Sequence, residues 1–155
     1  VIVGVAINTE KSPVLTTEER VDILRRITAG LPNVSVAGFS GLAFAFANAS
    51  GCNALVRGIR TVTDFEYEYA MAIANRKLGD IETIFLVSSE EFAFISSRLI
   101  REAASFGGDV SAFMPPQANE AFVRKIAQLF LDRFESLRDC LVGTHSNASA
   151  IRSAG

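Results

Sequence analysis

The chain opens with an apolar, largely β-branched run at residues 1–7, with no polar residues before it. Such a run predicts a strand buried on both faces, as in a parallel sheet. Thr16 and Glu19 follow with the spacing of a helix-capping box, and apolar residues then recur at helical intervals from Val21 to a stop at Gly30. The first pattern along the chain is therefore strand, loop and amphipathic helix.

Short apolar strands and amphipathic helices keep alternating after this point. The pattern predicts strands at 33–39, 54–56 and 82–87, and helices at 42–49, 64–78, 95–106 and 118–138. Strands that alternate with helices, without internal repeats or linkers, predict one α/β domain with right-handed crossovers and a parallel sheet. We expect this domain to occupy residues 1–138 and to end in a C-terminal helix, with a flexible tail over 139–155.

Composition narrows the function classes. A length of 155 residues fits one domain, and 49% hydrophobic against 21% charged residues excludes a disordered chain. A net charge of -2 argues against a general nucleic-acid binder. The longest apolar stretches are shorter than the ~20 residues that a membrane span requires. With only two cysteines, no disulfide framework is implied, so a reducing cytoplasm is the expected compartment.

Cationic residues follow two of the predicted strands. Ligands of parallel α/β sheets bind at the carboxyl ends of the strands, so the loops there are the first places to search. Lys11 follows the first strand, as a mobile charge for a phosphate or as a solvated surface lysine. Arg57 and Arg60 bracket Gly58 directly after a buried strand, where they suit an anion or structural ion pairs to Asp64 or Glu66.

Serines enter the helix predicted after the strand at 82–87. Ser96 and Ser97 stand where free N–H groups and hydroxyls make an anion site, although ordinary N-capping explains them equally well. An acidic cluster at Asp64, Glu66 and Glu68 suits the start of a helix, which favours a structural role.

Several other chemistries find no support. The only histidine, His145, lies in the predicted tail, which argues against Ser-His-Asp and Cys-His pairs. Cys52 and Cys140 lack metal-ligand spacing. There is no Walker A loop, and no G-x-G-x-x-G follows a strand.

Several segments, in their order and spacing, resemble the phosphopantetheine adenylyltransferase family over residues 1 to about 127 of the chain. They are Leu15-Thr16-Thr17-Glu18-Glu19-Arg20, Phe39-Ser40-Gly41-Leu42, Val56-Arg57-Gly58-Ile59-Arg60, Asp64-Phe65-Glu66-Tyr67-Glu68, Phe94-Ile95-Ser96-Ser97 and Gly107-Gly108-Asp109-Val110. The resemblance implies a Rossmann-like, doubly wound parallel sheet of the nucleotidyltransferase superfamily. It also implies transfer of the AMP of ATP to 4′-phosphopantetheine, with Mg²⁺ required, in a cytoplasmic homohexamer.

The family reaction has no covalent intermediate, so positioning and charge stabilisation carry the catalysis. By resemblance, Lys11 and Arg60 contact the reacting phosphates. Lys11 and Arg57, with Leu42 and Ala43 in the turn that also contains Gly41, bind the phosphopantetheine. The residues that the resemblance assigns to ATP are Gly58, Ile59, Arg60, Glu68, Phe92, Ala93, Phe94, Ile95, Ser96, Ser97 and Arg98. Arg98 replaces a serine that is frequent in the family.

The front of the chain departs from the family pattern. The family begins with a strand, a G-[ST]-F-D-P loop and a T-x-G-H motif, whose histidine stabilises the transition state, and none of these is in the sequence. We therefore expect the natural polypeptide to carry an additional N-terminal βα unit of about 30 residues. The resemblance makes the missing strand central, in an order like 3-2-1-4-5, so pairing between its two neighbours should be broken.

Two other functions stay open at this stage. One is a homologue that binds nucleotide or pantetheine without turnover. The other is a different nucleotidyltransferase of the superfamily, which joins another phosphate or alcohol to a nucleotide.

Overall fold

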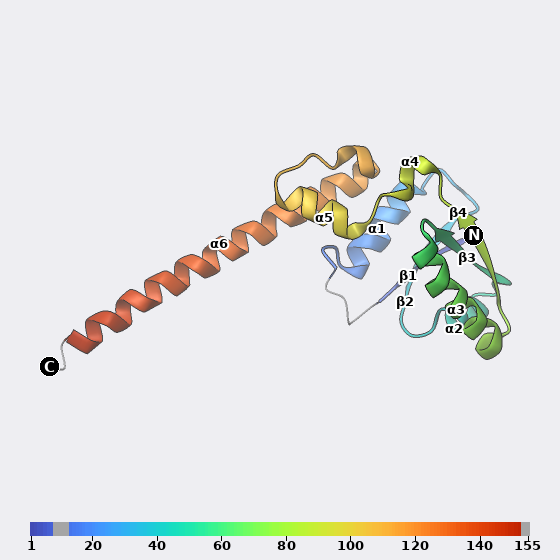
Figure 1. Ribbon diagram of the computed structural model, residues 1–155, viewed down its shortest axis with the longest axis horizontal. Coiled ribbons are helices and arrows are strands. Elements are labelled where there is room, and N and C mark those ends of the chain that lie inside the picture. Colours follow the sequence, from blue (N-terminus) through green and yellow to red (C-terminus); the bar gives the residue numbers. More distant parts are fainter. Residues whose placement is uncertain (8–12, 153–155) are drawn as a thin grey trace.

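The computed structural model describes the backbone of residues 1–7 and 13–152, and the side chains of these residues up to position 135. Strands and helices alternate along the chain as the sequence predicts (Figure 1). The elements are β1 (Ile2–Ala6), α1 (Thr17–Ile27), β2 (Ser35–Phe39), α2 (Ala43–Ala49), β3 (Ala54–Ile59), α3 (Val62–Gly79), β4 (Glu82–Val87), α4 (Glu90–Ala93), α5 (Ser97–Ser105), the 3₁₀ helix η1 (Ser111–Phe113) and α6 (Pro116–Arg152).

The four described strands form two parallel pairs. β1 pairs with β2, and β3 pairs with β4, in two separate two-stranded sheets. The predicted α/β class and the parallel pairing are confirmed. The break in pairing separates β1 and β2 from β3 and β4, which is where the strand order implied by the resemblance places it.

The predicted capping box fixes the start of α1. The Glu19 N–H donates to Thr16 Oγ1 at 3.2 Å, and the Thr16 N–H donates to Glu19 Oε2 at 2.7 Å. Val21 of α1 is buried with Val5 of β1 and Val36 of β2 in one apolar cluster. Helix α1 thus packs its apolar side on both strands of its own sheet.

Helix α3 packs on the second sheet in a different way. It contacts β3, β4 and α2, and the rings of Phe65 and Phe85 meet edge to face at 5.7 Å. Large apolar side chains also remain exposed on it, including Val62 at 76%, Tyr67 at 67% and Leu78 at 67%. A helix that is apolar on more than one side is typically covered on more than one side.

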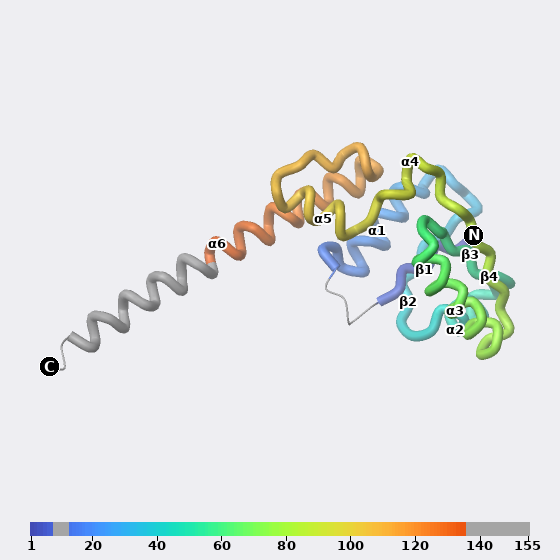
Figure 2. Tube along the Cα trace, in the orientation of Figure 1, coloured from blue at the N-terminus to red at the C-terminus, as the bar shows by residue number. Residues whose placement is uncertain are grey.

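The C-terminal elements form a second core. Ile100 of α5 and Phe122 of α6 are buried together with Val110, which lies between these helices in the sequence. Figure 2 shows α5 beside the first turns of α6. An ion pair between Lys125 Nζ and Glu19 Oε1 at 3.2 Å joins α6 to α1.

The last helix departs from its predicted bounds of 118–138. It begins at Pro116, where a proline suits the first helical turn, and continues to Arg152. Helix therefore extends into the segment for which we predicted a flexible tail, while the domain boundary at 138 stays a prediction. In the described part of the chain, no helix is both long and apolar enough to cross a bilayer.

Candidate functional site

The ends of β3 and β4 lie level with one another. The sequence pattern ends the third strand at Val56, but β3 runs on to Ile59 because Arg57, Gly58 and Ile59 pair with successive residues of β4. The Ser88 N–H then donates to the Ile59 carbonyl at 2.9 Å. Arg60 is therefore the first residue after β3, beside the segment that leaves β4.

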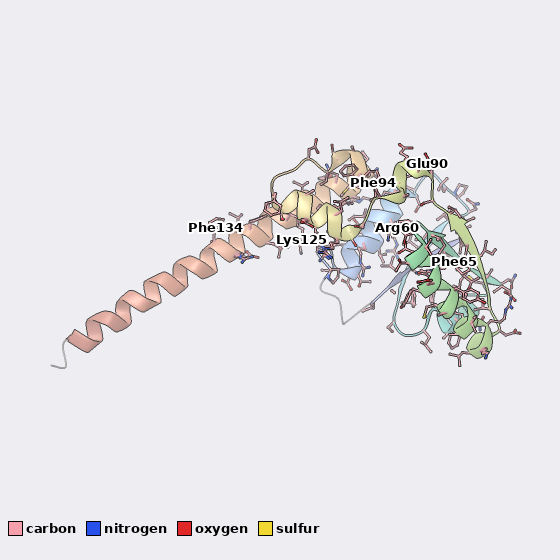
Figure 3. The ribbon with its side chains drawn as sticks, in the orientation of Figure 1. Arg60, Phe65, Glu90, Phe94, Lys125 and Phe134 are labelled. Atoms are coloured by element: carbon pink, nitrogen blue, oxygen red, sulfur yellow. The ribbon has the colours of Figure 1, made fainter. Side chains whose placement is uncertain are left out.

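The Arg60 guanidinium is held from two sides. Its Nε donates to Asp64 Oδ2 at 3.0 Å, and Nη2 lies 3.5 Å from Asp64 Oδ1. Its Nη1 donates to the carbonyl of Ile95, in the segment between α4 and α5 (Figure 3 labels Arg60 and Phe94). Of the two ion-pair partners that the sequence left open for the arginines, Asp64 is the one Arg60 uses.

Arg57 of β3 makes a bidentate ion pair with Glu68, which lies one turn after Asp64 on α3. Its Nε donates to Glu68 Oε2 at 2.8 Å and its Nη2 to Glu68 Oε1 at 2.5 Å. The hydrogen bonds to this carboxylate, followed by its negative charge, raise the pKa of Arg57 above its ordinary value. Both oxygens of Glu68 accept from Arg57, and the Glu68 side chain is only 14% exposed.

The segment that enters α5 combines structural and accessible groups. Ser96 is the N-cap, and its Oγ accepts from the Leu99 N–H at 3.2 Å, which confirms the capping interpretation for this serine. Ser97 begins the helix and is exposed. Ile95 packs against the second core, and the Phe94 ring meets Phe113 edge to face at 5.7 Å. The remaining residues of the predicted ATP segment are the exposed Phe92 and Arg98 and the half-buried Ala93.

The predicted pantetheine turn lies on the other sheet, after β2. Gly41 has φ +84, a conformation that favours glycine, and the exposed Leu42 precedes Ala43 at the start of α2. Within the described residues, no hydrogen bond or ion pair joins this turn to Arg57. Lys11 lies outside the described residues, so its place relative to the arginines stays a prediction.

A cavity of ≈ 750 Å³ lies between the start of α1, helix α5 and the first turns of α6. It is lined by Pro13, Val14, Leu15, Arg20, Ser97, Ile100, Arg101, Met114, Ala118 and Phe122. Arg20 also donates to the carbonyl of Ala6, the last residue of β1, at 3.2 Å. Arg101 donates through Nε to the Ser97 carbonyl at 3.2 Å, which holds it over the first turn of α5. Two cations and a helix-start serine thus face one cavity.

The cavity and Arg60 meet at the segment that enters α5. Arg57 and Arg60 do not line the cavity, but Arg60 binds Ile95, two residues before Ser97. Arg20 and Arg101 are not among the site residues predicted from the sequence. The spacing of Arg101, one helical turn after Ser97, is a signal that points to it.

Comparisons with known proteins agree with the resemblance seen in the sequence. Residues 1–103 match the family model described as cytidylyltransferase-like. The chain is 48% identical over 128 residues, covering 82% of its length and 78% of the relative's, to a curated protein of Azoarcus sp. (strain BH72) named phosphopantetheine adenylyltransferase. The chain belongs to the phosphopantetheine adenylyltransferase family. Its predicted family and its nucleotidyltransferase fold class are thereby confirmed.

The Mg²⁺ that the family resemblance implies finds no dedicated protein site among the described residues. In the described ranges, no three His, Cys, Asp or Glu side chains are grouped to hold an ion. The carboxylates nearest the two arginines, Asp64 and Glu68, already accept from those arginines. Mg²⁺ is usually held by substrate phosphates and few protein carboxylates.

Proposed function

We propose that this adenylyltransferase-family chain joins the AMP of ATP to 4′-phosphopantetheine and releases pyrophosphate, giving dephospho-coenzyme A. The observation that carries the proposal is Arg60 at the carboxyl end of β3, bound to the Ile95 carbonyl just before the helix start at Ser96 and Ser97. Guanidinium donors and a helix N-terminus together suit an anion such as a triphosphate.

In the proposed reaction, a phosphate oxygen of 4′-phosphopantetheine attacks the α-phosphorus of ATP. A new P–O bond forms as the bond from the α-phosphorus to the bridging oxygen breaks, and pyrophosphate leaves with the electron pair. No protein nucleophile is required. Arg60 and Lys11 would stabilise charge on the reacting phosphates, while Arg57, Leu42 and Ala43 would hold the phosphopantetheine.

The backbone beside Arg57 and Arg60 leaves space for a ligand. A Cβ placed on Gly58 would meet no atom within 4 Å, so a phosphate can approach the main chain there. Ile59 and Gly58 would then contact ATP, together with the segment 92–98. Glu68, which the resemblance assigns to the nucleotide, would reach ATP only by exchanging or sharing its bond to Arg57.

We further propose a homohexamer in the cytoplasm that uses Mg²⁺ with ATP. The exposed apolar side chains of α3, such as Val62, Tyr67 and Leu78, support an oligomer because covering them removes apolar area from water. Analytical ultracentrifugation of the natural protein tests this part. A monomer at micromolar concentration would contradict it.

Pyrophosphate release by the complete natural polypeptide tests the reaction. With ATP and Mg²⁺, release should require 4′-phosphopantetheine. Release with nicotinate mononucleotide or glycerol phosphate in its place would indicate another nucleotidyltransferase. Binding of both substrates without release would indicate a non-catalytic homologue.

A further inference from the structure

We infer that Asp64 is a positioning residue that orients Arg60 toward the triphosphate; the inference rests on the proposed function. A guanidinium has five N–H donors in a fixed planar arrangement. Asp64 engages the Nε edge of Arg60, and the Ile95 carbonyl accepts from Nη1. Within the described residues, this leaves donors on Nη1 and Nη2, at the end of the guanidinium away from Nε, for an anion.

Asp64 is itself fixed by the start of α3. Its backbone N–H donates to Oγ1 of the N-cap Thr61 at 3.1 Å, and its side chain is 29% exposed. The carboxylate therefore stands at a set place relative to β3, from which Arg60 extends. Because Arg60 also binds Ile95, its guanidinium connects the end of β3 with the segment that enters α5.

A second Arg–Asp pair in the chain has the same i,i+4 spacing but different surroundings. Arg26 Nε and Asp22 Oδ2 lie 3.1 Å apart on α1, with side chains 46% and 68% exposed. The Arg60 and Asp64 side chains are less exposed, at 38% and 29%. Exposed pairs of this kind contribute little, so Asp22 provides a matched control for Asp64.

The test uses Asp64→Asn, Asp64→Glu, Arg60→Ala and the double variant that combines Asp64→Asn with Arg60→Ala, all in the complete natural protein. Asp22→Asn is the control. Titration calorimetry with ATP alone measures affinity, and pyrophosphate release measures turnover. Asp64→Asn should weaken ATP binding about tenfold, since a misplaced charged group loses its ligand contacts. Asp64→Glu should recover part of this loss, and the KM for 4′-phosphopantetheine should change less than about threefold.

The double variant separates positioning from a general structural effect. If Asp64 acts through Arg60, Asp64→Asn costs no further ATP affinity once Arg60 is alanine. Thermal unfolding of each variant establishes the temperature at which all are folded, and affinities are compared there. Asp22→Asn should bind ATP as the unmodified protein does.

Three results would overturn the positioning role: unchanged ATP affinity in Asp64→Asn, an equal loss in the Arg60→Ala background, or no recovery in Asp64→Glu. Failure of the proposed reaction looks different. ATP affinity that depends on Asp64 through Arg60, without pyrophosphate release by the unmodified protein, supports the positioning role and refutes adenylyl transfer. No ATP binding by the unmodified protein would overturn both.

Discussion

The two strand–helix–strand units use their helices differently. In β1–α1–β2, the helix buries its apolar side on its own two strands. In β3–α3–β4, the helix exposes large apolar side chains and carries the ion-pair partners of two arginines. Val5, Val21 and Val36 close the core of the first unit. In the second unit, Asp64 and Glu68 pair with Arg60 and Arg57 at the end of β3. The same strand–helix–strand topology thus serves packing in one unit and charge placement in the other.

The difference lies in where the arginines start. Arg26 extends from the last turn of α1 into solvent, and its pair with Asp22 contacts no other element among the described ion pairs. Arg60 extends from the end of a strand, where a parallel α/β sheet presents its ligands. An ion pair of the same spacing therefore gains a role in binding from its position in the fold rather than from its sequence.

The largest expected effect is that of Arg60→Ala on turnover. Loss of a group that stabilises developing phosphate charge should lower kcat/KM by about 2–4 kcal/mol of transition-state free energy. Arg26→Ala, the equivalent change in the first unit, should change it by less than about 0.5 kcal/mol. Steady-state kinetics with ATP and 4′-phosphopantetheine provides the measurement, and equal effects of the two variants would refute the comparison.

Val21→Ala should act on stability alone. It removes two methylene equivalents from a side chain that is 8% exposed, for a loss of about 2 kcal/mol in the free energy of unfolding. Ile73 on α3 is 42% exposed within one chain, so burial within that chain accounts for less than about 1 kcal/mol of the cost of Ile73→Ala, and the proposed oligomer should add to it. Urea unfolding measures both; a larger loss for Ile73→Ala would show that α3 is covered in solution.

The two N-cap threonines offer a finer comparison. Thr16→Ala and Thr61→Ala each remove a hydroxyl that accepts a backbone N–H, so each should cost about 1 kcal/mol of stability. Only Thr61→Ala loosens the residue that holds Arg60, so it alone should weaken ATP binding. Equal ATP affinities of the two variants would contradict the role given to the start of α3.

The smallest effect is a pH dependence in the first unit. The hydrogen bond from the Thr16 N–H, with smaller contributions from Lys125, lowers the pKa of Glu19 below its ordinary value of 4.5. The stabilisation is present above pH 4.5 and is lost as pH falls through the lowered pKa. Glu19→Gln should flatten the decrease in stability below about pH 5, measured by urea unfolding across the acid range. A slope identical to that of the unmodified protein would contradict this assignment.

Local signals predicted the elements well. Strand 82–87 matches β4, and the Thr16–Glu19 box begins α1, because alternation and capping are written within a few residues. The sequence pattern ends β3 too early, since Arg57 and Gly58 carry no apolar signal and are held in the strand by their pairing with β4. Helix α4 was not predicted; it is only one turn long.

The sequence predicts the residues of the site better than it predicts their contacts. The sequence offered Asp64 or Glu66 as an ion-pair partner for the arginines, and Arg60 binds Asp64. The bond from Arg60 to Ile95 joins residues far apart in the chain and has no local signal. The bidentate partner of Arg57 is Glu68 rather than Glu66, because the helix turns Glu68 toward the strand. Contacts that close across the sheet come from tertiary structure, which periodicity does not specify.

Arginine Nε signals in ¹H–¹⁵N spectra, recorded as ATP is added to the complete natural protein, test most directly where the triphosphate binds. The signal of Arg60 should shift with ATP, while that of Arg26 in the first unit should stay in place. A shift confined to Arg20 and Arg101, with Arg60 unmoved, would place the triphosphate in the cavity between α1, α5 and α6 and contradict the role given to the end of β3.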